Sequence, residues 1–190
     1  MAQGVLARVF DVHSQEKDAN ERLLEYCRIT NRLQLNPSDL RNIEQTYRDN
    51  KALVLVAVRR NGYALKYASD RLKNTEDVVL EAVKNNGHGL QFANVRLQDN
   101  ENIATAAVKC IPAALQHASE RMRDTEAVVL EAVRGNGLVL KYAGENTRSM
   151  KNVVEEAIKL KKGFFTFEDR GRVLEYTDPE TRSHFLDNES

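Results

Sequence analysis

Residues 74–98, NTEDVVLEAVKNNGHGLQFANVRLQ, carry the pattern that decides the fold, because the same pattern returns every 25 residues. Residues 124–148 read DTEAVVLEAVRGNGLVLKYAGENTR, and related stretches lie before, between and after these two. The most regular column is alanine, at Ala57, Ala82, Ala107, Ala132 and Ala157. A fixed period of this length is typical of a repeat protein, in which each unit buries its apolar side only against its neighbours.

Each unit predicts a helix, a turn and a second, shorter helix. In residues 74–98, Thr75 and the acids after it favour a helix start, and apolar residues follow with helical spacing. We expect the first helix to end at Gly62, Gly87 and Gly137, each preceded by asparagine, with the glycine in the left-handed conformation. No strand pattern is present. The sequence therefore predicts an all-α fold, an α-solenoid of tandem two-helix 25-residue repeats with helical caps at both ends.

The repeat array is predicted to occupy residues 49–167. Complete units span 49–73, 74–98, 99–123 and 124–148, and a partial unit spans 149–167. We assign residues 1–48 to an N-terminal helical cap and residues 168–190 to a C-terminal cap or tail, where Pro179 follows Asp178 as a helix start. In the third unit Cys110-Ile111-Pro112 replaces the asparagine-glycine turn, so we expect its helices to meet at a different angle.

The repeated pattern also resembles a known family. Its features are two apolar residues, then Ala-Val, Asn-Gly and Leu-x-aromatic-Ala, as in VVLEAVKNNGHGLQFAN, VLVAVRRNGYALKYASDRL and VVLEAVRGNGLVLKYAG. This is similar to the helical repeat catalogued as domain of unknown function 4116, over residues 50–167. The resemblance implies helical repeats of the kind found in protists and in bacteria that live inside amoebae, where some members are secreted effectors. It implies no catalytic residue.

One surface column is basic in every copy. It consists of Arg59, Lys84, Lys109, Arg134 and Lys159, in the last turn of each first helix, and we call it the basic column. Helices stacked about 8–10 Å apart would turn it into a row of cations suited to an acidic partner or a polyanion. The alternative is structural, because cations at a helix C-terminus offset its dipole. A glutamate also lies three residues before most of them, in salt-bridge register, and only Arg59 and Lys109 lack one.

A second column lies on the shorter helix and is aromatic or carries imidazole. It consists of Tyr67, Phe92, His117, Tyr142 and Phe167, with Tyr63 and His88 close by. Aromatic side chains are favoured anchors of binding sites, so this column is also a candidate for binding a partner. The alternative is packing between successive units, and one side chain can serve both purposes. A shorter basic series is interpreted as neutralised by the acids that follow it: Arg71, Arg96 and Arg121.

Composition and spacing argue against several other functions. The 28 Lys and Arg residues balance 28 Asp and Glu, whereas a nucleic-acid-binding protein usually has a basic excess. No apolar stretch approaches the roughly 20 residues that cross a membrane, and charges come too early for a signal peptide, so we expect a soluble cytoplasmic protein. The histidines, Cys27 and Cys110 show no metal-ligand spacing. Glycine-rich turns follow helices instead of strands, so we expect no cofactor, no metal and no catalytic residue.

The predicted function is therefore a non-enzymatic scaffold that binds another protein, which the sequence does not identify, through one face of its stacked helices. By resemblance, the chain is a candidate effector delivered into a host cell. The first alternative is binding of an anionic ligand or nucleic acid through the basic column, with strong salt dependence as its sign. The second is an enzyme that uses His88 or His117, which would require acids converging on the imidazole ring.

Overall fold

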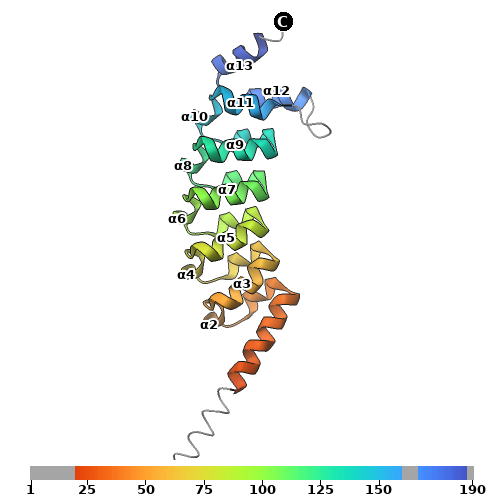
Figure 1. The fold of residues 1–190 in the computed structure, drawn as a ribbon, viewed down its shortest axis with the longest axis vertical. Helices are drawn as coiled ribbons and strands as arrows, with labels where there is room; N and C mark the ends of the chain where they lie inside the picture. The colour runs from red at the N-terminus through yellow and green to blue at the C-terminus, as the bar shows by residue number, and fades with distance from the viewer. Residues whose placement is uncertain (1–19, 160–166, 188–190) are drawn as a thin grey trace, which may run out of the picture.

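The computed structural model describes residues 20–159 and 167–187 and shows an elongated stack of helices (Figure 1). No strand occurs within these two ranges. The predicted all-α solenoid is confirmed. Residues 160–166, which include Phe164 and Phe165 of the predicted last unit, lie outside the described residues.

Each unit contains a long α-helix, a six-residue 3₁₀ helix and a one-turn α-helix. The first set is α3 (Lys51–Arg60), η2 (Gly62–Tyr67) and α4 (Asp70–Lys73). The next sets are α5 (Glu76–Asn85), η3 (Gly87–Phe92) and α6 (Val95–Gln98); α7 (Glu101–Cys110), η4 (Pro112–His117) and α8 (Glu120–Arg123); and α9 (Glu126–Gly135), η5 (Gly137–Tyr142) and α10 (Glu145–Arg148). The predicted second helix is thus divided in two, because the chain becomes extended at Ala68 and Ser69 then caps α4.

The N-terminal region has the backbone of a further unit. A helix over residues 20–35 is followed by η1 (Pro37–Asn42) and α2 (Gln45–Arg48), each 25 residues before its counterpart in the first complete unit. The Asn36 side chain accepts a hydrogen bond from the Ser38 N–H and caps η1, as Asn61 caps η2. The predicted N-terminal helical cap therefore repeats the design of the array.

The C-terminal end closes the stack with two further helices. After α11 (Lys151–Ile158) come α12 (Phe167–Glu175) and α13 (Pro179–Asp187). Helix α12 contacts α11 and η5 and buries Val173 and Leu174, so it covers the apolar end of the array. Helix α13 begins at Pro179 as predicted, and Asp178 Oδ1 accepts a hydrogen bond from the Thr181 N–H at 3.0 Å.

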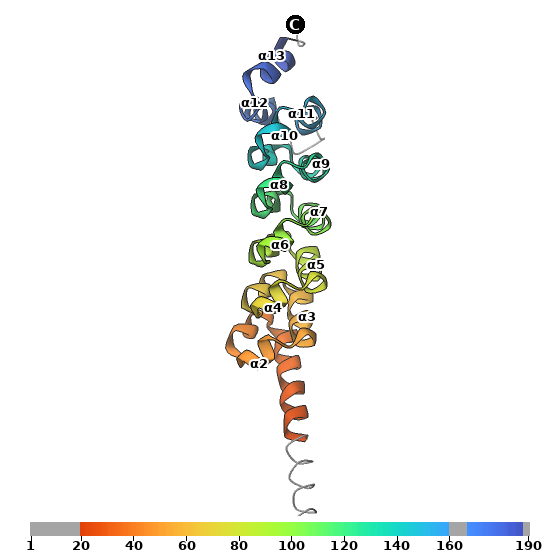
Figure 2. The same ribbon diagram turned by 90° about the vertical axis from the view of Figure 1, so that its left-hand side faces the viewer.

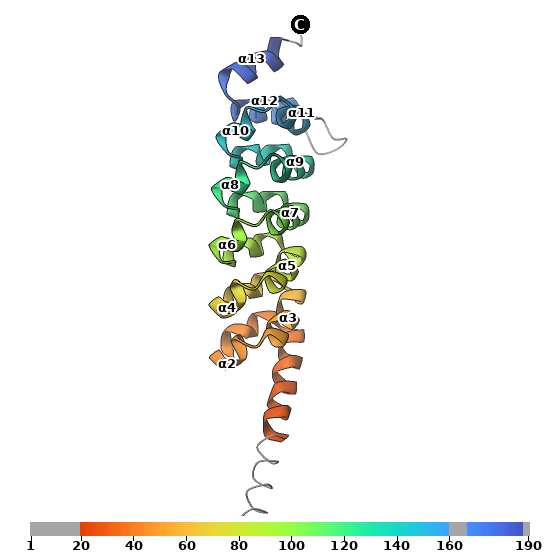
Figure 3. The ribbon, with the colours of Figure 1, turned by 60° about the vertical axis from the view of Figure 1, so that its left-hand side comes forward.

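The helices stack in two layers that share one continuous core. The long helices α3, α5, α7, α9 and α11 contact one another in sequence order, and so do the 3₁₀ helices η1 to η5. The long helices form one column in Figure 2, and the one-turn helices line one edge in Figure 3. The alanine and leucine columns are buried between the layers: Ala57, Ala82, Ala107, Ala132 and Ala157, and Leu65, Leu90, Leu115 and Leu140.

The glycine after each long helix has a different role from the predicted one. The turn residue Asn61 is extended, with φ −150° and ψ 107°, and neither Gly62 nor Gly87 is left-handed. A Cβ atom at Gly62 would lie 2.1 Å from the carbonyl oxygen of Ala82, and one at Gly87 would lie 2.3 Å from that of Ala107. The prediction of a left-handed cap is therefore wrong. Glycine is required because the turn packs against the backbone of the next unit.

The turn at Pro112 has the same backbone conformation as the other turns, which removes the reason for expecting a different angle between the helices of the third unit. The angle itself stays a prediction. Ile111 has φ −141° and ψ 107°, close to the φ −148° and ψ 109° of Asn86. An extended conformation is what a residue before proline prefers. Pro112 occupies the first position of η4, where an N–H has no partner within the helix.

Candidate partner-binding surface

The 3₁₀ helices η2 to η5 carry the aromatic column on the outer side of their layer, apart from Phe167, which begins α12 and whose side chain lies outside the described part of the chain. In η2, Tyr63 and Lys66 are exposed while Gly62 and Leu65 are buried, because residues three apart lie on the same side of a 3₁₀ helix. The other three helices repeat this arrangement. We define the aromatic face as the exposed and half-buried side chains of the four helices: Tyr63, Lys66, Tyr67, His88, Gln91, Phe92, Pro112, Ala113, Gln116, His117, Leu138, Lys141 and Tyr142.

Successive units contact each other through aromatic pairs on this face. The rings of Tyr63 and Phe92 meet edge to face, with centroids 5.1 Å apart and planes at 73°. The Gln91 side-chain amide donates a hydrogen bond to the Tyr63 hydroxyl at 3.0 Å. These side chains therefore pack between units while part of each stays accessible to solvent.

At the next junction the same positions hold two histidines. The rings of His88 and His117 have centroids 5.4 Å apart, and Nδ1 of His88 lies 3.2 Å from Nε2 of His117. Burial and the neighbouring His88 lower the pKa of His117 below its ordinary value. The His117 side chain is therefore mostly neutral at pH 7.

The aromatic face carries cations and no acid. The Lys66 ammonium lies 6.0 Å from the centre of the Tyr67 ring, and the Lys141 ammonium lies 4.8 Å from that of Tyr142. Both distances suit cation–π contacts. No Asp or Glu occurs in η2, η3, η4 or η5. A chain without net charge thus presents four adjacent helices that carry no carboxylate of their own.

The basic column is largely paired along the stack. The Arg59 Nε atom lies 2.8 Å from Glu81 Oε2 on the next long helix. Arg134 approaches Glu156 of the following unit at 3.9 Å and Glu131 of its own helix at 3.7 Å. Arg59, which has no glutamate three residues before it, therefore pairs with one that lies 22 residues later.

Two members of the basic column differ from the rest. Among residues 20–159 and 167–187, neither Lys84 nor Lys109 forms an ion pair. Glu81 lies three residues before Lys84 but is bound to Arg59 of the preceding unit. The next unit offers Lys84 no glutamate either, because Ala106 occupies the position equivalent to Glu81. Lys159, the last member, pairs with Glu156 at 2.6 Å.

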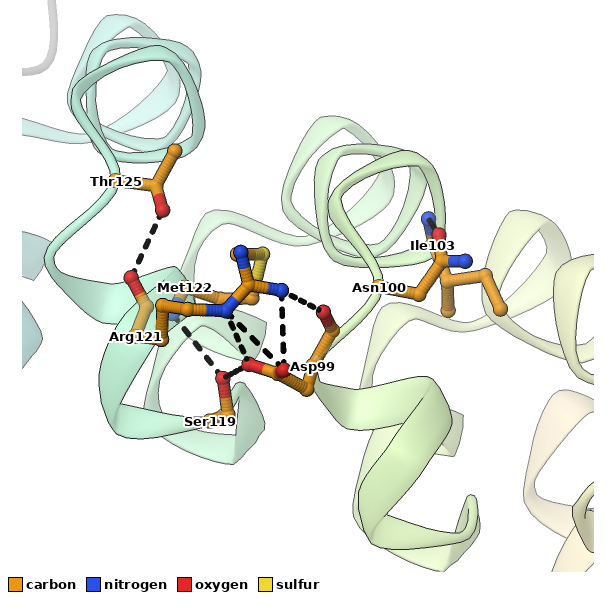
Figure 4. A network of polar contacts seen from close by, with 7 residues as sticks. All are labelled: Asp99, Asn100, Ile103, Ser119, Arg121, Met122 and Thr125. Carbon is orange, nitrogen blue, oxygen red and sulfur yellow. Dashed lines mark hydrogen bonds and ion pairs between the residues drawn. The ribbon is translucent and has the colours of Figure 1, made fainter.

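The arginine series in the short helices fastens each unit to the one before it. Arg121 Nε donates to Asp99 Oδ1 at 3.0 Å and Arg121 Nη2 donates to the Asp99 carbonyl oxygen at 2.7 Å (Figure 4). The Ser119 hydroxyl donates to the same carboxylate. Arg71 binds Asp49 and Arg96 binds Asn74 in the same way.

Their partners are not the acids that the sequence suggested. Each partner precedes its arginine by 22 residues and ends a one-turn helix, whereas we had expected neutralisation by the acids that follow. The hydrogen bonds from Arg121 and Ser119 lower the pKa of the Asp99 carboxyl below its ordinary value. A column of Asp or Asn at positions 49, 74, 99 and 124 was visible in the sequence and is the signal that predicts this network.

The part of the chain that the structure describes contains no group of three or more His, Cys, Asp or Glu residues that could hold a metal ion. No described helix is long and apolar enough to cross a membrane. Cys27 and Cys110 are both exposed and free.

Comparison with protein families identifies the same repeat. A family model described as Domain of unknown function (DUF4116) matches residues 50–98 and again residues 100–148. The chain belongs to this family. Each DUF4116 match spans two of the 25-residue units, and the recognition of the family from the repeat pattern is confirmed. No curated protein and no solved structure matches the chain.

Proposed function

We propose that this DUF4116 chain is a non-enzymatic helical-repeat module that binds another protein through its aromatic face. The observation that carries the proposal is the composition of that face: tyrosine, phenylalanine, histidine and lysine on four adjacent helices, without a carboxylate. Action in the cytoplasm, including that of a host cell, belongs to the same proposal and rests on the family resemblance alone.

The physical argument concerns what such a face offers a partner. Aromatic side chains on this face are already held in place by the neighbouring unit, as Tyr63 is by Phe92 and Gln91, so little conformational entropy is lost on binding. Aromatic residues carry a large share of the energy at protein interfaces. Lys66 and Lys141, with no acid on the four helices, favour a partner segment that is itself acidic.

The test compares two variants with the same change in charge on two surfaces. Proteins captured with the intact chain would be purified and titrated against each variant by calorimetry. Lys66→Glu with Lys141→Glu alters the aromatic face, and Lys84→Glu with Lys109→Glu alters the basic column. We expect the first variant to weaken binding by about tenfold or more, and the second to leave the affinity within about twofold. Melting curves establish that both variants are folded.

The reverse result would support a second candidate function, an anionic ligand bound through the basic column. Lys84 and Lys109, which lack an ion pair among the described residues, are the observation in its favour. In that case the affinity would fall steeply with salt concentration and only the second variant would lose binding. If both variants bind like the parent chain, the partner-binding surface lies elsewhere and the proposal fails.

A further inference from the structure

Two of the four histidines of the chain face each other across one junction between units. His88 belongs to η3 and His117 to η4, and both rings are half-buried. The backbone around His88 is fixed at two points: its N–H donates to Asn86 Oδ1 at 3.0 Å, and its carbonyl oxygen accepts from the Gln91 side chain at 3.0 Å. The His88 imidazole is therefore presented by a well-defined backbone.

The separation of their nitrogens fits two ligands of one metal ion. Imidazole nitrogens bind Zn²⁺ at about 2.0–2.1 Å, and two corners of such a coordination tetrahedron lie about 3.3 Å apart. Nδ1 of His88 and Nε2 of His117 are 3.2 Å apart. A neutral imidazole offers one nitrogen lone pair to a metal and keeps its proton on the other nitrogen. The same distance also suits a hydrogen bond between the rings, so an experiment must separate the two.

The preceding junction shows that packing does not require histidine here. Tyr63 and Phe92 lie 25 residues before His88 and His117 and meet in the same edge-to-face manner, with centroids 5.1 Å apart. The junction therefore accepts two aromatic rings without metal-binding atoms. Replacement of both rings by imidazole at a single junction brings together two side chains that favour the same ions.

We propose that His88 and His117 form a two-histidine site for a divalent transition-metal ion that bridges the second and third units. This inference does not depend on the proposed partner. With two protein ligands, the site has fewer than the three or four of catalytic and structural zinc sites, and water would complete the coordination. No carboxylate on η2 to η5 adds a further ligand. The affinity should therefore be modest and follow the order Cu²⁺ above Ni²⁺ and Zn²⁺, with Mn²⁺ weaker.

The bridge would act on the stability of the array. Each unit of a repeat protein contacts only its neighbours, so stability depends on the interfaces between units. An ion that binds the folded junction and not the unfolded chain stabilises the folded state, so the melting temperature rises with the concentration of the free ion. The readout is therefore available without a partner and without any activity.

The experiment titrates Zn²⁺, Ni²⁺ and Cu²⁺ into the full chain by calorimetry, with Mg²⁺ as a comparison ion. All variants carry Cys27→Ser and Cys110→Ser, because both thiols are free and bind the same metals. His88→Tyr with His117→Phe removes the site and recreates the ring pair of the preceding junction, so it should fold normally. The matched control is His184→Ala, a histidine in α13.

We expect the parent chain to bind one equivalent of ion. This binding should be lost in the variant with His88→Tyr and His117→Phe and kept in the His184→Ala control. His117→Gln, which removes one ligand, should lower the affinity by at least about tenfold. Tyr63→His with Phe92→His should create a second site and raise the stoichiometry from one to two. Binding that survives in the Tyr-Phe variant, equal binding of Mg²⁺, or no saturable binding of any of the three transition metals would each overturn the proposal. The last outcome would assign the pair to a hydrogen bond alone.

Discussion

Gly135 lies against the ring of Pro112, and a Cβ atom at position 135 would come within 2.3 Å of Pro112 Cγ. At the equivalent place two units earlier, Asn85 Oδ1 accepts a hydrogen bond from the Gly62 N–H at 2.8 Å. Proline has no N–H to donate and glycine has no side chain to accept. The two departures from the repeat pattern therefore compensate each other.

The first prediction tests this compensation. Gly135→Asn should destabilise the protein by about 1–3 kcal/mol, because the new side chain collides with the proline ring. Adding Pro112→Gly should recover much of the loss by recreating the pairing of Gly62 with Asn85. Urea denaturation of the parent, both single variants and the double variant gives the coupling energy, which should exceed about 0.5 kcal/mol. Additive effects would show that the two positions are independent.

The second prediction concerns the alanine column. Ala82→Leu and Ala132→Leu should each lower the free energy of unfolding by about 1–3 kcal/mol, because both positions are fully buried. Ala127→Leu, on the exposed side of α9, is the matched control and should stay within about 0.5 kcal/mol. Denaturation midpoints measure all three. Equal effects at the buried and exposed alanines would contradict the close packing described for this column.

The third prediction concerns acid. The pKa of Asp99 is lowered in the folded state by Arg121 and Ser119, so the unfolded state binds more protons as the pH falls. The stabilisation is present above about pH 4 and is lost as the pH falls through the folded-state pKa. Asp99→Asn imitates the natural Asn74, which Arg96 already binds at 3.0 Å. The free energy of unfolding of this variant should fall less than that of the parent between about pH 5 and pH 3.

One result would contradict the prediction that Asp99 makes the folded protein sensitive to acid. If the parent and Asp99→Asn lose stability in parallel over that range, the carboxylate at position 99 does not contribute to acid sensitivity. Asp70→Asn is a suitable control, because the Asp70 side chain is fully exposed and, among the residues that the structure describes, pairs with the Lys73 side chain three residues later.

The fourth prediction concerns length. Removal of residues 74–98 deletes one unit and joins Lys73 to Asp99, which occupies the position of Asn74. The shortened chain should keep its helical signal per residue by circular dichroism and melt at a lower temperature, because one interface between units is lost. A deletion of similar size that is out of register, residues 80–98, should abolish the cooperative transition. If both deletions behave alike, the 25-residue register does not govern folding.

Much of the fold could be predicted from periodicity, because the alanine and leucine columns are buried in all complete units. Predictions failed where a contact joins two units. The sequence places Gly62 at the turn, as the structure does, but the reason that glycine is required there is the Ala82 carbonyl of the next unit. The rules for helix caps consider only neighbours in sequence and do not include this contact. The division of the second helix into η2 and α4 was not predicted, because the residues at the break, Ala68 and Ser69, are neither proline nor glycine.

The candidate site was partly predictable for the same reason. Sequence columns identify which residues share a surface, so Tyr63, Phe92, His88 and His117 were selected correctly as neighbours of one row. Columns do not show which member of one unit contacts which member of the next. His88 contacts His117, 29 residues later, and Arg59 contacts Glu81, 22 residues later. Neither separation equals the 25-residue repeat, so these pairs are identified only from the coordinates.

The short sequence separation of the contacts between units has a consequence for how such an array can lengthen. The polar side-chain contacts between units described above join residues separated by 20 to 29 positions, from Ser119 with Asp99 to His88 with His117. Adding a unit adds contacts of the same short span and none of longer span. Folding rates fall as the mean sequence separation of contacts rises relative to chain length, so a duplicated unit imposes no longer search on the chain. The architecture can therefore lengthen by duplication of its gene segment without a topological penalty.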